Sequence, residues 1–132
     1  MLWVGVGGGG GGHAGVGVCA GDGGGSSYGA MVGGFNDNDT GAYSLIAGAS
    51  NVAGPYAFAV GHSNVASGLQ SSVSGGESNV ASVGAGGASV AGGEGNSASG
   101  DWASVGGGKD NSASGTNSSV GGGEDDVADG NF

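Results

Sequence analysis

The residue types that could perform chemistry are scarce in this chain. It has two histidines, His13 and His62, one cysteine, Cys19, eleven acids and a single basic residue, Lys109. A Ser-His-Asp triad or a histidine-rich metal site needs such groups close together, whereas the two histidines lie far apart in the repeat pattern described below. We therefore expect no catalytic residue, no metal ligand, no cofactor and no enzymatic activity. His62 is interpreted as a solvated turn residue, and Cys19 as a small apolar residue.

Three glycine-rich stretches resemble binding motifs without completing them. The run GVGGGG at 5–10 matches the dinucleotide pattern G-x-G-x-x-G, but no helix-forming segment and no ribose-binding acid follow it. The stretch GGGKD lacks the Ser or Thr that follows the lysine in a phosphate-binding loop. In GGEGNSASGD, Asn96 and Ser97 stand where a calcium-binding nonapeptide has its aspartate. None of the three stretches predicts a ligand.

Composition narrows the class of protein further. Glycine accounts for 38 of the 132 residues, and the net charge is −10. Nucleic-acid binding requires clustered Lys and Arg, and an anionic membrane would repel this chain, so neither is an expected partner. The N-terminal run MLWVGVGGGG is too short to span a bilayer, so we expect no direct membrane insertion by this segment. Glycine- and serine-rich chains are often disordered, but the regular apolar spacing described next favours an ordered fold.

Internal repeats run through most of the chain and define its organisation. Residues 1–37 form a Gly-rich N-terminal segment with degenerate repeats, and residues 38–132 form a regular array. The last unit stops in mid-repeat, which favours a piece of a longer chain. Aligned on a recurrent asparagine, the units are 38–50, 51–63, 64–78, 79–95, 96–110, 111–125 and a partial unit, 126–132.

Each unit contains two short segments in which residue types alternate, and this period of two predicts β-strands. One segment centres on alanine, as at Ala53. The other has a small residue followed two positions later by an apolar one, as at Ala103 and Val105, with serine between them facing the opposite way. Two strands and two turns in 13–17 residues make one coil. The predicted fold is all-β, a Gly-rich parallel β-solenoid or β-roll with coils about 4.8 Å apart.

The recurrent asparagine falls in one column when the coils are stacked. Its side-chain amides can form a structural ladder there, and asparagine also tolerates the left-handed turn conformation. Glycine fills the other corner, where a positive φ or a close approach is required. The predicted ladder consists of Asn38, Asn51, Asn64, Asn79, Asn96 and Asn111.

Three large apolar residues fall on the face of the coil that should point outward. Leu45, Phe58 and Val60 occupy positions that later units fill mainly with serine. Because so narrow a coil buries little apolar surface, an outward apolar stripe predicts an interface. We expect a homo-oligomer, most simply a trimer, with these three residues at the oligomer interface.

One column of aromatic residues supplies candidate adhesive contacts. Tyr43, Tyr56 and Trp102, together with Phe132, each lie two residues after a corner glycine. Rigid aromatic side chains give a large contact area at low entropic cost, which suits an adhesive surface. The alternative is that they stack on the flank of the roll.

A second column, at a corner, is charged. It contains Glu77, Glu94, Lys109 and Glu124. Stacked like charges repel one another, so Lys109 is interpreted as relieving that repulsion. The alternative is a cation held between Glu77 and Glu94.

The stretches NSASGDWASVGGG and NVASGLQSSVSGG resemble the head repeats of YadA-like trimeric autotransporter adhesins, the haemagglutinin-type repeats. The resemblance covers residues 38–132 well and 13–37 weakly. It implies a left-handed parallel β-roll that trimerises, stands at a bacterial cell surface as a virulence factor of the outer membrane, and binds host or matrix molecules. Most units here have fifteen residues, where those adhesins commonly have fourteen. Similar repeats occur in phage tail fibres.

We therefore expect a structural and adhesive module of a cell-surface adhesin or fibre. Its expected partners are further copies of itself and a protein or glycan receptor, at an extracellular location or a bacterial cell surface. The alternatives are a receptor-binding segment of a phage tail fibre, located on the virion, and an ice-binding solenoid, which the serine-rich rows suggest.

Overall fold

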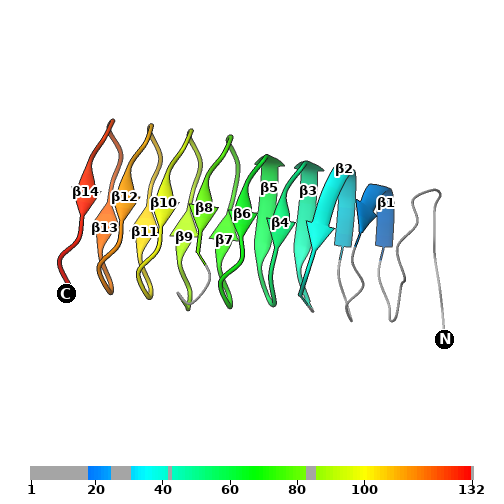
Figure 1. The fold of residues 1–132 in the computed structure, drawn as a ribbon, viewed down its shortest axis with the longest axis horizontal. Coiled ribbons are helices and arrows are strands. Elements are labelled where there is room, and N and C mark those ends of the chain that lie inside the picture. The colour runs from blue at the N-terminus through cyan, green and yellow to red at the C-terminus, as the bar shows by residue number, and fades with distance from the viewer. Residues whose placement is uncertain (1–17, 25–30, 42, 83–85, 132) are drawn as a thin grey trace.

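The computed structural model describes residues 18–24, 31–41, 43–82 and 86–131, and these form a rod of stacked coils (Figure 1). The fourteen strands of the described residues belong to one hydrogen-bonded sheet, and they pair in parallel. The described residues contain no helix, and so none that could cross a membrane. The predicted fold class, an all-β parallel β-solenoid, is confirmed.

The strands are short, and most contain only two residues. They are β1 (Val18–Gly24), β2 (Met31–Asp39), β3 (Leu45–Ala49), β4 (Val52–Ala53), β5 (Phe58–His62), β6 (Val65–Ala66), β7 (Ser72–Val73), β8 (Val80–Ala81), β9 (Ser89–Val90), β10 (Ser97–Ala98), β11 (Ser104–Val105), β12 (Ser112–Ala113), β13 (Ser119–Val120) and β14 (Val127–Ala128).

Strand order divides the rod into two faces. Strands β3, β5, β7, β9, β11 and β13 follow one another on the first face, and β4, β6, β8, β10, β12 and β14 on the second. The nine-residue β2 turns the corner, because residues 31–35 pair with β3 and residues 38–39 pair with β4. Each coil therefore contributes one strand to each face.

The interior consists of straight columns of small apolar side chains. Alternation along each strand sends one residue inward and the next outward, so equivalent residues of successive coils stack. Each fully buried valine contributes about 2 kcal/mol from burial of its side chain. The first face contributes Ile46, Ala59, Val73, Val90, Val105 and Val120, and the second contributes Ala53, Ala66, Ala81, Ala98 and Ala113.

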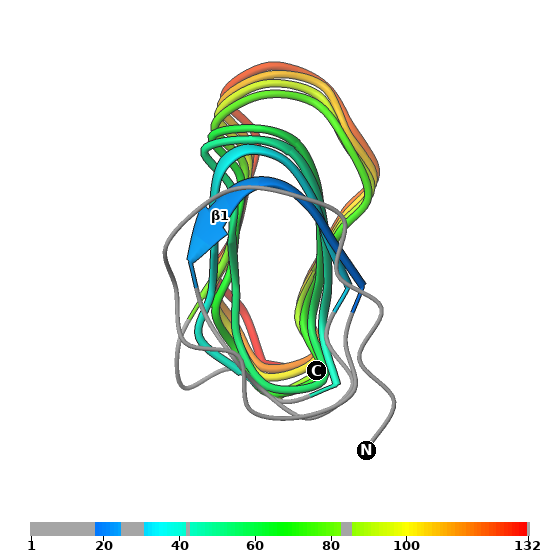
Figure 2. The same ribbon diagram turned by 90° about the vertical axis from the view of Figure 1, so that its right-hand side faces the viewer.

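Coil length changes along the rod. Leu45 and Phe58 occupy the same column and are 58 − 45 = 13 residues apart, whereas Ser104 and Ser119 are 119 − 104 = 15 residues apart. Seen along the rod, the coils superpose as a flattened oval, and the later coils extend further at one end of it (Figure 2). The strand columns stay in register, so the turns accommodate the extra residues.

One corner of every coil requires glycine because the next coil passes very close to it. Gly93 has a φ of 88°, and a methyl group on its Cα would collide with the carbonyl oxygen of Gly108. A left-handed residue follows this corner glycine by two positions, as Ser78, with a φ of 58°, follows Gly76. That residue directly precedes the ladder asparagine. The ladder asparagines themselves do not have a positive φ, so the left-handed conformation that asparagine tolerates is not used there.

Candidate functional site

The asparagine column is the central structural element of the coil. In Asn96, Nδ2 donates to the carbonyl oxygens of Gly92 and Gly108, both at 2.9 Å, and Oδ1 accepts from the backbone N–H of Asn111 at 3.0 Å. Each side chain thus ties its own coil to the next. The predicted ladder is confirmed for five members, which are 0–1% exposed: Asn51, Asn64, Asn79, Asn96 and Asn111.

Asn38 is not part of this ladder, which corrects the prediction. It pairs with Val52 in the register of the second face and is exposed. The ladder position belongs to the preceding residue, Asp37, whose Oδ1 accepts from the backbone N–H of Asn51 at 2.8 Å and from its Nδ2 at 3.0 Å. A shift of one residue along a strand moves a side chain to the opposite face. Alignment on the letter N therefore selected the wrong residue of the pair.

The predicted aromatic column is present along one edge of the rod. Tyr43, Tyr56 and Trp102 all adopt a left-handed conformation, with φ of 59°, 55° and 58°. Their exposed fractions are 58%, 56% and 62%. Neighbouring coils carry Gln70 and Asn117 with the same backbone conformation. The fourth predicted member, Phe132, lies outside the described residues.

These aromatic side chains rest partly on the rod, as the alternative interpretation expected. The rings of Tyr43 and Tyr56 stack with centroids 5.2 Å apart and planes at 21°. The ring of Trp102 lies over Gly87 of the preceding coil, because a methyl group there would collide with Cε3 and Cζ3. Stacking holds the rings in place while more than half of each side chain faces solvent, which suits a rigid contact surface.

The outward apolar stripe lies where the sequence predicts it. Leu45 and Phe58 share a column with Ser72, and Val60 lies on the same side of β5, two residues further along. All three are half-buried within the single chain. Part of each side chain is therefore accessible to a partner.

Sequence analysis missed a second apolar row on the opposite face. Val52, Val65 and Val80 stand in register on β4, β6 and β8 and point outward, half-buried. The same column continues as Ser97 and Ser112. The repeated Asn-Val-Ala beginning of three units could have revealed it, because a valine between two inward residues must face outward.

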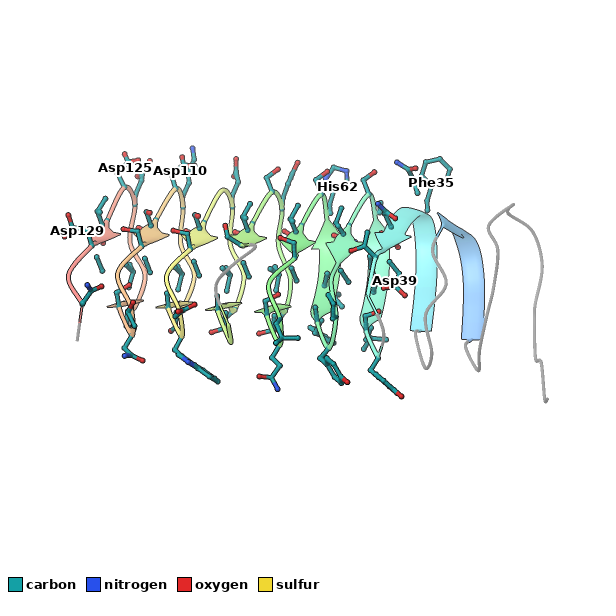
Figure 3. The ribbon with its side chains drawn as sticks, turned by 60° about the horizontal axis from the view of Figure 1, so that its bottom comes forward. Phe35, Asp39, His62, Asp110, Asp125 and Asp129 are labelled. Atoms are coloured by element: carbon teal, nitrogen blue, oxygen red, sulfur yellow. The ribbon has the colours of Figure 1, made fainter. Side chains whose placement is uncertain are left out.

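The charged corner column stacks as predicted and begins one coil earlier. Backbone bridges connect His62 to Glu77, Glu77 to Glu94, Glu94 to Lys109, and Lys109 to Glu124. Nδ1 of His62 lies 3.3 Å from Oε1 of Glu77, and both side chains are more than half exposed. Figure 3 shows this edge, where His62 projects between the labelled Phe35 and the two stacked aspartates, Asp110 and Asp125.

The described residues contain no group of three His, Cys, Asp or Glu side chains close enough to hold a metal ion. The chain matches no protein-family model, and no curated protein sequence matches it. Fold and surface together define the class: a glycine-rich β-solenoid repeat protein with an internal amide ladder. The surface carries an aromatic edge, a charged edge and partly apolar faces.

Proposed function

We propose that this chain is a structural and adhesive module of a cell-surface adhesin or fibre. The observation that carries the proposal is the line of exposed aromatic side chains, Tyr43, Tyr56 and Trp102, along one edge of the rod. The coil does not need them, because other coils carry Gln70 or Asn117 in the same backbone conformation. Large apolar side chains that the fold does not use are typical of binding surfaces.

The net charge of the chain limits the chemical class of receptor that it can bind. With a net charge of −10 and one basic residue, the rod has no cationic patch to attract an anionic surface. Aromatic edges instead suit protein or glycan surfaces, where stacking and apolar contact supply the binding energy. The receptor is therefore a protein or glycan of a host, matrix or cell surface, and the module works outside the cell or on a virion.

Self-association forms the second part of the proposal. The stripe of Leu45, Phe58 and Val60 lies on one face, and the row of Val52 and Val65 on the other. Three rods around a common axis would each place one of these faces toward a neighbour and bury it. The resemblance to the repeats of trimeric adhesins supports this arrangement. The same resemblance implies a left-handed coil.

The adhesive role is tested by removing the largest aromatic side chain. We expect Trp102→Ala to keep the native circular dichroism spectrum and to weaken attachment of the purified protein to cells or matrix-coated surfaces. Gln70→Ala, in the same column and with the same φ sign, is the matched control and should attach normally. Equal attachment of wild type, Trp102→Ala and a Tyr43→Ala/Tyr56→Ala double variant would argue against this edge as the contact surface.

Regular serine rows on the first face favour a second candidate, ice binding. Ser72, Ser89, Ser104 and Ser119 stand in one column with the regular spacing of parallel strands. Leu45 and Phe58 precede these serines in the same column, so the hydroxyl row covers only part of the face. Thermal hysteresis of a purified sample would support this candidate, and its absence would remove it.

A further inference from the structure

Two carboxylates are buried inside the coil at the N-terminal end of the regular array. Asp37 and Asp39 lie two residues apart on β2, so both side chains point inward, and each is 2% exposed. Figure 3 labels Asp39 away from the edge that carries His62. One oxygen of each is satisfied: Oδ1 of Asp37 by Asn51, and Oδ1 of Asp39 by the N–H of Gly41 at 3.0 Å.

The second oxygen of each carboxylate has no donor. Oδ2 of Asp37 and Oδ2 of Asp39 are buried and accept no hydrogen bond from any of the described residues. A buried carboxylate is stable only when it is paired, protonated or bound to a metal ion. Two such oxygens on one strand therefore require a positive species nearby.

The surroundings of Oδ2 in Asp37 show what kind of species is needed. A methyl group on Gly34 would lie 2.7 Å from this oxygen, just as one on Gly93 would lie 2.7 Å from Nδ2 of Asn96. Oδ2 of Asp37 thus takes the place of the amide nitrogen. In the asparagine coils, that nitrogen donates to two carbonyl oxygens, one four residues earlier and one in the glycine corner of the next coil.

At Asp37 the corresponding carbonyl oxygens, by the strand register, belong to Gly33 and Gly48. A carboxylate has no hydrogen to donate to them. By this register, three oxygen atoms meet at a position where each of the five asparagine coils has an N–H donor. Such a cluster of hard oxygen atoms is the ligand environment that Ca²⁺ prefers.

No side chain among the described residues supplies the missing charge. Lys109 is its only Lys or Arg, and it lies in the exposed corner column several coils away. His62 is exposed on the same corner beside Glu77. None of the described residues therefore neutralises the pair, which leaves a cation from solvent.

We propose that a divalent cation of the Ca²⁺ class binds inside the coil between Asp37 and Asp39. Its ligands are the two free Oδ2 atoms, the carbonyl oxygens of Gly33 and Gly48, and water. Two carboxylates match the charge of one divalent ion, and an oxygen-only set favours Ca²⁺ over Zn²⁺. Only two of the proposed ligands are acidic side chains, and main-chain carbonyl oxygens and water complete the coordination. The proposal does not depend on the adhesive function.

Calorimetric titration of the whole chain tests the site directly. After treatment with EDTA, the protein is titrated with CaCl₂ at about 150 mM NaCl, where binding to exposed acids is largely screened. We expect one saturable Ca²⁺ per chain, and a melting temperature that is higher in Ca²⁺ than in EDTA. Asp37→Asn restores the ladder amide, so this variant should lose the isotherm, and its melting temperature should not respond to Ca²⁺.

Matched variants separate this site from other acids. Asp126 occupies the ladder position of the last coil, where its N–H bonds to Oδ1 of Asn111, but it is exposed. Asp126→Asn and Glu94→Gln should keep the isotherm, whereas Asp39→Asn should weaken it. Identical melting in Ca²⁺ and EDTA without saturable binding would overturn the proposal. Stabilisation by acid alone would also overturn it, since a proton would then neutralise the pair, as would loss of binding in Glu94→Gln only.

Discussion

At the scale of single residues, the ladder asparagine makes a combination of hydrogen bonds that aspartate and alanine cannot make. Its amide nitrogen donates to two carbonyl oxygens and its amide oxygen accepts a backbone N–H, so one buried side chain bonds three main-chain groups. Aspartate has the same shape but lacks the two hydrogens, and it takes the ladder position before the first asparagine, at Asp37, and after the last, at Asp126. The asparagine side chains are buried, so water does not replace their hydrogen bonds.

Replacing one ladder asparagine should therefore destabilise the fold far beyond the loss of its volume. Asn79→Ala removes one donor from each of the carbonyl groups of Gly75 and Gly93 and leaves the buried N–H of Asn96 without its acceptor. We expect a loss of about 3 kcal/mol or more in the free energy of unfolding, measured with urea. Ser97→Ala, on the outer face, should stay within about 0.5 kcal/mol of wild type.

The inward column of the first face gives a second residue-scale prediction. Val105 is 1% exposed, and the adjacent Ser104 points outward. Val105→Asp buries an unpaired charge at a cost of several kcal/mol, so we expect the native β spectrum to be lost. Ser104→Asp should fold. A native circular dichroism spectrum for Val105→Asp would contradict the inward assignment of this column.

At the scale of the element, the strands are too short to be stable alone, and the coil is the folding unit. Most strands have two residues, and their hydrogen bonds go to the coils before and after. The turns between them are specified tightly, because the glycine corner leaves no room for a side chain. Local sequence preference matters less here than the fit between successive coils.

Two adjacent glycines should differ sharply in their tolerance of substitution. Gly93→Ala would place its Cβ against the carbonyl of Gly108 at a φ of 88°, whereas at Gly92 the nearest atom to an added Cβ lies 3.9 Å away. We expect Gly93→Ala to lower the melting temperature markedly and Gly92→Ala to change it little. Similar melting temperatures of the two variants would contradict the close packing of this corner.

The sequence predicted the later coils of the array more accurately than the first coil. Period-two alternation and equal spacing placed Val105 and Ala53 in the core, and the outward stripe at Phe58, because stacking repeats each position. The error at Asn38 arose because a coil boundary is defined by which residue points inward, and both Asp37 and Asn38 fit the pattern of letters. The buried Asp39 was also missed, since alanine or another small residue occupies that position in the other coils.

At the scale of the whole molecule, the two faces differ along the rod. The apolar residues Phe58 and Val65 lie toward the N-terminal coils, and the serine residues Ser104 and Ser112 toward the C-terminal ones. The apolar contacts of an interface between copies would therefore come mainly from the N-terminal coils of the regular array. The net charge of −10 on each chain opposes this association, so added salt should strengthen it.

Oligomerisation can be tested with substitutions that the chain itself uses. Serine replaces Leu45 and Phe58 in the later coils of the same column, so Leu45→Ser/Phe58→Ser should keep the coil intact. We expect wild type to sediment as a trimer and the double variant as a monomer with a native β spectrum. A wild-type protein that sediments as a folded monomer at all concentrations would contradict the interface.

The direction of the hydrogen bonds also determines how the rod should respond to a pulling force. Backbone bonds between coils, such as Ser97 N–H to Asn111 O at 2.8 Å, run along the rod axis, and β1 and β14 lie at opposite ends (Figure 1). Tension applied between the ends therefore breaks the hydrogen bonds of one coil boundary after another. Each fifteen-residue coil released should lengthen the chain by about 5 nm. The rod would thus extend under load in small steps of one coil each, while the remaining coils stay folded.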